Sequence, residues 1–328
     1  MRCRNQLKTL RTLLLLGGAM LAASCVQDDR SDCRFPLRVE FQRATNAEIL
    51  TRAASDDFNG ELEELTLYLY DRASGQLVAE VQPPMEAAHT SDPYVWPVPP
   101  GTYRVVAWGG AKERHTVTAH ETLDGATLSV NRLEDGVSVE ARRAHLYYGQ
   151  LDSVVITGDY TPAHRVDLYK NSKDIRLELV GLTAEERSRA VCTVTASNGT
   201  YLFDNTLLPE QEPVTYLMTD TPDAHNLIRT FTTLGLQAGD DSHLRIELLP
   251  EAPATDDEET PQTRAAEGHV IYDGSLSELL LVRPGTDLKW DDEFVIKMNY
   301  YGQAADGSSH LDIWVNDWHI IHQNGGLE

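Results

Sequence analysis

The chain has 328 residues, of which 51 are acidic and 28 are Lys or Arg, so its formal net charge is −23. A surface this acidic repels phosphate backbones and anionic lipid headgroups, which excludes nucleic acid as a partner. The hydrophobic content of 41% is ordinary for a globular protein and excludes a disordered acidic tail, and the length is sufficient for two cores.

The N-terminus has the order of a secretory signal. Residues 1–11 contain four basic and no acidic residues, and the apolar and glycine run Leu13–Ala23 leads through Ser24 to Cys25. The run is too short to span a bilayer as a helix. A cysteine at this point resembles a bacterial lipoprotein signal, although Ala22 stands where such signals usually carry leucine. We predict a signal peptide over residues 1–24 and acylation of Cys25. The alternative is an ordinary signal peptide cut nearby, which would leave a soluble secreted protein.

Residues 25–34 are predicted to be an acylated linker. Asp28 and Asp29 follow the cysteine closely, which is similar to the acidic signal that sends Bacteroides-type lipoproteins to the outer face of the outer membrane. A solvated linker is the alternative interpretation. Because no other apolar segment is long enough to cross a membrane, the lipid on Cys25 is the predicted contact with the outer membrane.

Two cysteines remain after export, because Cys3 leaves with the signal and Cys25 carries the lipid. Cys33 and Cys192 could form one disulfide in an oxidising compartment. They are 159 residues apart, and closing so long a loop stabilises a protein by about 4–5 kcal/mol in the chain-entropy model. The spacing does not show that they meet, so two separate thiols remain the alternative.

The rest of the chain alternates between apolar and polar residues with period two, which predicts half-buried strands. Turn signals such as Ser74-Gly75, Asn198-Gly199 and Asp273-Gly274 separate them, and only Thr183–Arg189 reads as a helical turn. Short strands punctuated in this way predict an all-β protein of antiparallel sandwiches. The predicted strands include residues 37–41, 65–70, 103–107, 166–168, 175–179, 244–248, 294–300 and 311–315.

A domain boundary is predicted near Tyr169–Lys173, where the polar run Lys170–Asp174 separates two strand patterns. This gives an N-terminal β-sandwich over residues 35–170 and a C-terminal β-sandwich over residues 171–328, both of ordinary domain size.

The sequence contains no recognisable catalytic, cofactor-binding or metal site, so we predict neither an enzyme nor a cofactor. His319 and His322 lie in a strand-like context, and the triad types in Asp240–His243 lack a nucleophile elbow. Paired carboxylates are expected by chance in so acidic a chain. Exposed tryptophans could bind sugar, although such residues more often lie in cores; the five are Trp96, Trp108, Trp290, Trp314 and Trp318.

Several motifs, taken together in order, resemble one family over essentially the whole mature chain. After the lipoprotein cysteine they are Ser31-Asp32-Cys33, Leu37-Arg38-Val39, Leu65–Asp71, Pro100–Tyr103, Val105–Trp108, Leu146–Gly149 and Asp312–Trp318. This looks like the FimB-type fimbrial anchor family of Bacteroides-like bacteria, within the fimbrillin superfamily. The resemblance implies two tandem transthyretin-like sandwiches, export as a lipoprotein, and a role in the attachment, assembly and length of fimbriae.

The resemblance also implies stalk subunits as partners, which polymerise by strand donation: an extended segment of one subunit fills a groove in the sheet of the next. In stalk subunits, proteolysis after an arginine removes the first strand. Here Arg52 follows the first predicted strand. An anchor should keep that strand, and a Cys33–Cys192 bridge would hold it even after a cut. We favour the anchor; a stalk or tip subunit processed after Arg52, and a glycan-binding surface lipoprotein, are the alternatives.

The predicted contact with the fimbria lies at the end opposite the lipid. The candidates are the strand Leu311–Val315 and the tail from Trp318 to Glu328, in which Ile320 and Ile321 are apolar among polar residues. These two isoleucines either dock a partner or cover the protein's own core, and the core interpretation is favoured.

Overall fold

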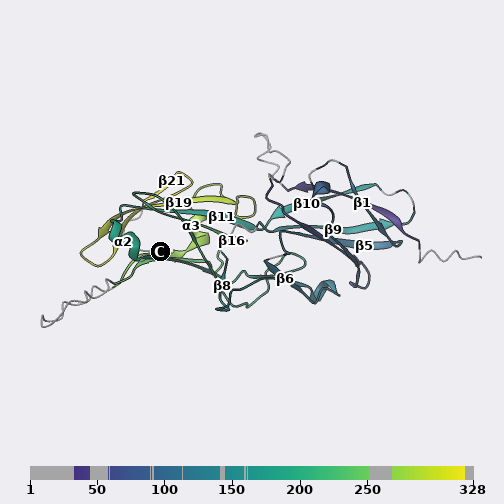
Figure 1. Ribbon diagram of the computed structural model, residues 1–328, viewed down its shortest axis with the longest axis horizontal. Coiled ribbons are helices and arrows are strands. Elements are labelled where there is room, and N and C mark those ends of the chain that lie inside the picture. Colours follow the sequence, from purple (N-terminus) through teal and green to yellow (C-terminus); the bar gives the residue numbers. More distant parts are fainter. Residues whose placement is uncertain are drawn as a thin grey trace, which may run out of the picture.

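A computed structural model of the chain describes residues 33–44, 58, 60–88, 90, 92–112, 114–140, 145–158, 160, 162–250 and 268–321. These residues form an elongated, almost entirely β molecule with two lobes (Figure 1). We call described residues up to 170 the N-terminal half and those from 171 the C-terminal half. Among the described residues, no helix is both long and apolar enough to cross a membrane.

The N-terminal half is built on a seven-stranded sheet with the order β3-β2-β5-β9-β10-β1-β4. Strand β10 pairs with β1 over residues 163–168 and with β9 only at its last two residues, so the sheet divides there into two layers. The elements of the N-terminal half are β1 (Phe35–Arg43), β2 (Leu65–Asp71), β3 (Leu77–Val81), η2 (Met85–Ala88), β4 (Tyr94–Val98), β5 (Gly101–Gly109), β6 (His115–Thr118), η3 (Leu123–Gly125), β7 (Thr127–Val130), β8 (Ser138–Val139), β9 (Tyr147–Ile156) and β10 (Ala163–Lys170).

The C-terminal half packs a six-stranded sheet, β15-β16-β11-β19-β20-β21, against a five-stranded sheet, β18-β17-β12-β14-β8. Alternating side chains of β11 and β19, such as Leu177 and Ile296, enter the core between the two sheets. The elements are β11 (Ser172–Val180), α2 (Ala184–Arg189), β12 (Ala190–Ala196), β13 (Thr200–Leu202), β14 (Val214–Tyr216), β15 (Thr219–Thr221), β16 (Leu227–Leu234), β17 (His243–Leu248), β18 (His269–Ser275), α3 (Leu276–Leu281), β19 (Glu293–Gln303), β20 (Ser309–Val315) and β21 (Trp318–Ile321).

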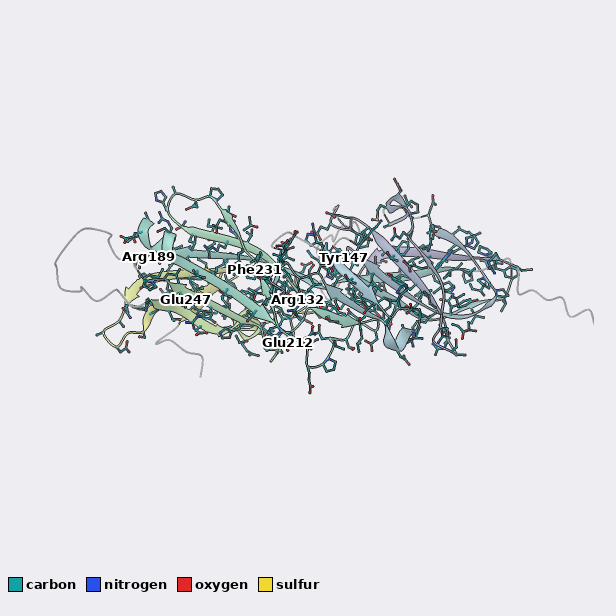
Figure 2. The ribbon with its side chains drawn as sticks, turned by 60° about the horizontal axis from the view of Figure 1, so that its bottom comes forward. Arg132, Tyr147, Arg189, Glu212, Phe231 and Glu247 are labelled. Carbon is teal, nitrogen blue, oxygen red and sulfur yellow. The ribbon has the colours of Figure 1, made fainter. Side chains whose placement is uncertain are left out.

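The two halves exchange strands. β8 comes from the N-terminal half but pairs in parallel with β14 in the C-terminal sheet. In return, β13 of the C-terminal half pairs with β7, in a three-stranded sheet with β6. Arg132 links the two halves at this exchange, because its guanidinium donates hydrogen bonds to the carbonyl oxygens of Glu212 (2.8 Å) and Pro213 (3.1 Å). Figure 2 shows Arg132 and Glu212 near the centre of the molecule.

The exchange creates an apolar cluster at the junction. Phe203, just after β13, is completely buried, with its ring centroid 5.0 Å from that of Tyr68 and 6.1 Å from that of Trp108. Strand β2 is consequently buried on both faces: Leu67 and Leu69 face the N-terminal core, and Tyr68 and Tyr70 face the cluster. The alternating pattern of β2 indicates one buried face only, whereas Phe203, which covers the second face, comes 135 residues after Tyr68 in the sequence.

The all-β prediction and the main predicted strands are confirmed, as is the helical turn, in which Thr183 and Glu186 form a capping box. Helix α3 was missed, and the Asp273-Gly274 turn was wrong because both residues lie in β18, paired with β17. The transthyretin-like detail and the boundary between residues 170 and 171 stay predictions.

Candidate functional site

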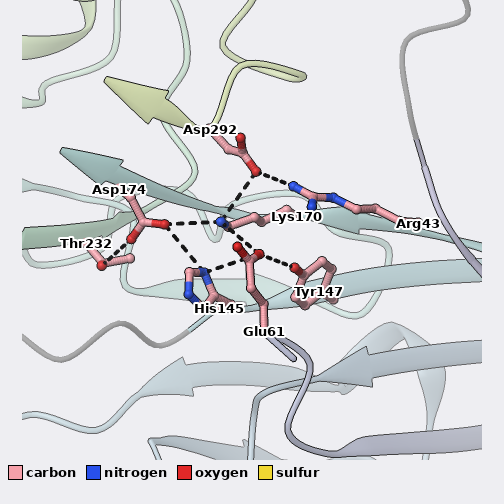
Figure 3. A network of polar contacts seen from close by, with 8 residues as sticks. All are labelled: Arg43, Glu61, His145, Tyr147, Lys170, Asp174, Thr232 and Asp292. Atoms are coloured by element: carbon pink, nitrogen blue, oxygen red, sulfur yellow. Dashed lines mark hydrogen bonds and ion pairs between the residues drawn. The ribbon is translucent and has the colours of Figure 1, made fainter. Parts of the chain in front are cut away.

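A cluster of charged side chains joins the two halves around Lys170, the last residue of β10 (Figure 3). Its ammonium lies 3.1 Å from Asp174, 3.2 Å from Glu61 and 3.4 Å from Asp292, and only 4% of its side chain is exposed. Arg43, at the end of β1, makes a second ion pair with Asp292 at 2.8 Å. One buried lysine therefore connects carboxylates from both halves of the chain.

The opposite charges in this cluster stabilise the ionised forms of the groups that carry them. Burial by itself would raise the pKa of Asp174, but a hydrogen bond from Thr232 (2.7 Å) and the charge of Lys170 hold that pKa below its ordinary value. Burial by itself would also raise the pKa of Glu61. A hydrogen bond of 2.8 Å that Tyr147 donates to Glu61 opposes this effect, and the net result is a lowered pKa. For Lys170, burial lowers the pKa but the three carboxylates raise it above its ordinary value. At neutral pH these groups are ionised, and their ion pairs hold the two halves together.

The polar run that indicated a domain boundary is buried rather than solvated. Lys170, Ser172 and Lys173 are 8%, 0% and 2% exposed, and β11 begins two residues after β10 ends. Asn171 lies between the two strands, and its side chain exchanges hydrogen bonds with that of Asn205, just after β13. The run was predicted as a domain boundary, and its role in joining the two halves was missed. The signal for that role was a charged pair, Lys173 and Asp174, at the start of an alternating strand.

Strand β1 is integrated in its sheet along both edges. It pairs in parallel with β10 and antiparallel with β4, and its alternate side chains Phe35, Leu37, Val39 and Phe41 are buried in the N-terminal core. Burial of each such side chain stabilises the fold by about 1.5–3 kcal/mol. The first strand is therefore a structural part of the N-terminal half.

The C-terminal strand β21 lies at the edge of the six-stranded sheet and pairs only with β20 among the described residues. Ile320 is 8% exposed and belongs to the C-terminal core, as the favoured interpretation expected. The backbone of Ile321 is part of β21, but its side chain lies outside the described structure.

The remaining predicted positions divide into two groups. Cys25 and Arg52 lie outside the described residues. Cys33 is exposed just before β1 and Cys192 is half-buried in β12; the structure has both as free cysteines, which is the alternative of two separate thiols. The pairing of Cys33 with Cys192 stays a prediction.

The tryptophans do not form a common surface. Trp96 and Trp108 are buried, and Trp314 is stacked on His319 with a centroid distance of 4.4 Å. Trp318, at the start of β21, is 47% exposed. In the triad-like segment, Ser242 donates to Asp240, while His243 instead contacts Asp273. Within the described ranges, no three His, Cys, Asp or Glu residues are arranged to hold a metal ion.

Solved structures show that this two-lobed fold is shared. The fimbrial anchor protein Mfa2 from Porphyromonas gingivalis has a TM-score of 0.68 at 18% identity, covering 88% of this chain and 99% of that one. A candidate polysaccharide-binding protein from Bacteroides thetaiotaomicron has a TM-score of 0.67 at 19% identity, with 88% and 98% covered. A candidate adhesin from Bacteroides ovatus has 0.66 at 18% identity, with 90% and 96% covered. A sequence comparison with curated proteins finds no match.

Two β lobes joined by exchanged strands define an elongated all-β protein whose fold is consistent with β-sandwich domains. The model of the Fimbrillin-A associated anchor proteins Mfa1 and Mfa2 matches residues 30–324. The chain belongs to this family, which confirms the resemblance to fimbrial anchors and gives it an anchor- or adhesin-like role in fimbriae at the cell surface.

Proposed function

We propose that the protein is a lipid-anchored subunit of the outer membrane that attaches the fimbria to the cell surface and limits its assembly. The family match over residues 30–324 carries this proposal. The lipid is placed on Cys25, in the leading segment of the chain, and stalk subunits are the proposed partners, joined by strand donation. This role requires no catalytic residue and no cofactor.

The position of β1 favours the anchor over a stalk or tip subunit. An anchor must keep the segment that links its fold to its lipid, and β1 is the strand that follows Cys25 in the sequence. Because β1 is paired on both edges and contributes four core side chains, its removal would open a groove and expose that core. Processing after Arg52 with release of β1 would instead define a stalk or tip subunit.

Intact mass of the protein from outer membranes tests this proposal directly. The expected species carries acyl chains on Cys25 and is uncut at Arg52. Loss of the segment before residue 53 would replace the anchor by a stalk or tip subunit. The same spectrum reports whether Cys33 and Cys192 pair in the cell.

Replacement of the acylated cysteine provides a second test with a matched control. Cys25→Ala should release the protein from membranes without changing its thermal midpoint, whereas Cys33→Ala, which alters an exposed free cysteine, should leave it membrane-bound. Retention of the Cys25→Ala protein after a high-salt wash would contradict lipid anchoring.

We place the contact with the fimbria at the C-terminal edge, around β21 and the residues that follow it. The edge position of β21 and the exposed ring of Trp318 support this placement. Deletion of residues 322–328 should abolish fimbria attachment with an unchanged thermal midpoint. Ile320→Ala should instead lower the midpoint because Ile320 is buried in the core. Normal attachment after the deletion would move the contact elsewhere.

A glycan-binding role is the second candidate, and one relative of similar fold is described as a candidate polysaccharide-binding protein. A glycan array with the whole protein distinguishes it from an anchor without ligands.

A further inference from the structure

A cleft of about 920 Å³ opens at the junction of the two halves. One wall is formed by side chains of β9 and β10, and the other by the loops at residues 235–238 and 286–289 and the turn at Asp204 and Asn205. Ligand sites of proteins commonly have this size and commonly lie between domains.

One of the cations that line the cleft is buried and makes no ion pair with a side chain that the structure describes. Lys173 lines it with 2% of its surface exposed, and among the residues that the structure describes its ammonium has neither a hydrogen bond nor an ion pair. Lys170, three residues earlier, shows the contrast, since it is matched by three carboxylates. An isolated buried ammonium is strongly unfavourable unless an acceptor reaches it.

The pKa of Lys173 is set by its burial and by the charges around it. Burial lowers the pKa of Lys173 to about 8, although nearby carboxylates act to raise it (Asp292, Asp291 and Asp287) and Lys170 acts to lower it. At neutral pH the group is therefore mainly protonated and carries a charge that the described side chains do not pair.

Lysine is concentrated here in a chain that has little of it. The sequence has six lysines, and Lys170, Lys173 and Lys289 all line this cleft, together with Arg165. The same lining contains four aspartates, Asp152, Asp167, Asp204 and Asp287, so its formal charges balance, whereas the whole chain has a net charge of −23. A balanced lining repels a negative group less than the rest of this acidic chain does.

The rest of the lining favours a ligand rich in hydroxyl groups. Most of the lining side chains can form hydrogen bonds, including the amides of Gln150, Asn205 and Gln237 and the carboxylate of Asp204. Amides and carboxylates accept from and donate to hydroxyls in several directions. A peptide ligand would need apolar pockets for its anchoring side chains, and leucines form only a minority of this lining.

We propose that the cleft binds an acidic sugar of the uronate class, whose carboxylate pairs with the Lys173 ammonium and whose hydroxyls bond to the amide and carboxylate side chains around it. This binding activity is additional to the attachment role and does not depend on lipidation or on fimbria assembly.

Calorimetric titration with oligogalacturonate, beside the matched neutral galactose oligosaccharide, tests the proposal. The wild-type protein should bind the uronate and discriminate against the neutral sugar. Lys173→Met should weaken uronate binding about 10- to 100-fold, because a hydrogen bond to a charged group is lost. Gln237→Ala, at an exposed position of the cleft, should weaken it less, and Lys112→Met, outside the cleft, should not change it.

The Lys173→Met variant is expected to fold, because it replaces a buried unpaired charge by an apolar side chain of similar length. Its thermal midpoint should equal or exceed that of the wild type. Absence of uronate binding, equal binding of the neutral sugar, or unchanged affinity in Lys173→Met would each overturn the proposal. Lysine-dependent binding of a peptide with a terminal carboxylate, without uronate binding, would overturn the sugar class.

Discussion

Replacement of Lys170 by Met should destabilise the protein by about 2–4 kcal/mol at pH 7. Removing one partner of a buried ion pair typically costs about 3–5 kcal/mol, because the other charge stays buried without compensation. Here the three carboxylates keep 16–22% side-chain exposure, and Arg43 remains beside Asp292, so part of that cost is relieved. Denaturant unfolding of the whole protein measures the difference.

The loss should depend on pH in a defined direction. In the wild type, the lowered pKa values of Glu61 and Asp174 contribute stability that is present above their unfolded pKa values, about 4, and is lost as the pH falls through the folded ones. Without Lys170 these carboxylates protonate more easily in the folded state. The deficit of Lys170→Met should therefore shrink as the pH is lowered from about 7 towards about 4.

Lys112→Met is the matched control, because Lys112 is exposed and its ammonium donates a hydrogen bond to the side chain of Gln82. It should change the free energy of unfolding by less than about 0.5 kcal/mol. A loss below about 1 kcal/mol for Lys170→Met at pH 7, or a loss that is equal at both pH values, would refute the electrostatic account of the junction.

Three further experiments test packing and backbone geometry by denaturant unfolding. Phe203→Ala should cost about 3–5 kcal/mol and separate the unfolding of the two halves, because its fully buried ring fills the junction cluster; one unchanged transition would contradict this. Gly181→Ala should lower the free energy of unfolding more than Gly239→Ala does. Both glycines have positive φ, but only at Gly181 would a Cβ meet the carbonyl oxygen of Tyr300. Equal losses of stability would exclude this steric explanation. Thr183→Ala should cost about 1 kcal/mol through loss of the α2 capping box, and a neutral effect would mean that tertiary packing alone holds that helix.

The sequence predicted the strands well because each has a clear alternation with a core on one side. The alternation of Ile175, Leu177 and Leu179 identifies β11 without knowledge of its neighbours. Helix α3 was missed although Ser275 and Glu278 have the spacing of a helix start; Ser275 does cap Glu278. The short leucine run that follows fits a strand as well as a buried helix.

The junction could not be predicted in the same way, because its contacts join residues far apart in the sequence. Lys170 meets Glu61 across 109 residues, and nothing in either local pattern indicates that pairing. Lys173 did carry a signal: it falls on the inward-facing positions of β11, in register with Ile175, where a strand normally places an apolar residue.

The exchanged strands have a mechanical consequence. In the proposed role, tension enters from the fimbria and leaves through the lipid, and must cross from one half to the other. The backbone makes that crossing at the β10–β11 link and again where β8 and β13 enter the opposite half. A pull along the molecule is thus shared among several backbone connections and their hydrogen bonds instead of one flexible tether. Because resistance to force depends on the rate of unfolding, such load sharing would slow rupture even if the equilibrium stability of each half were ordinary.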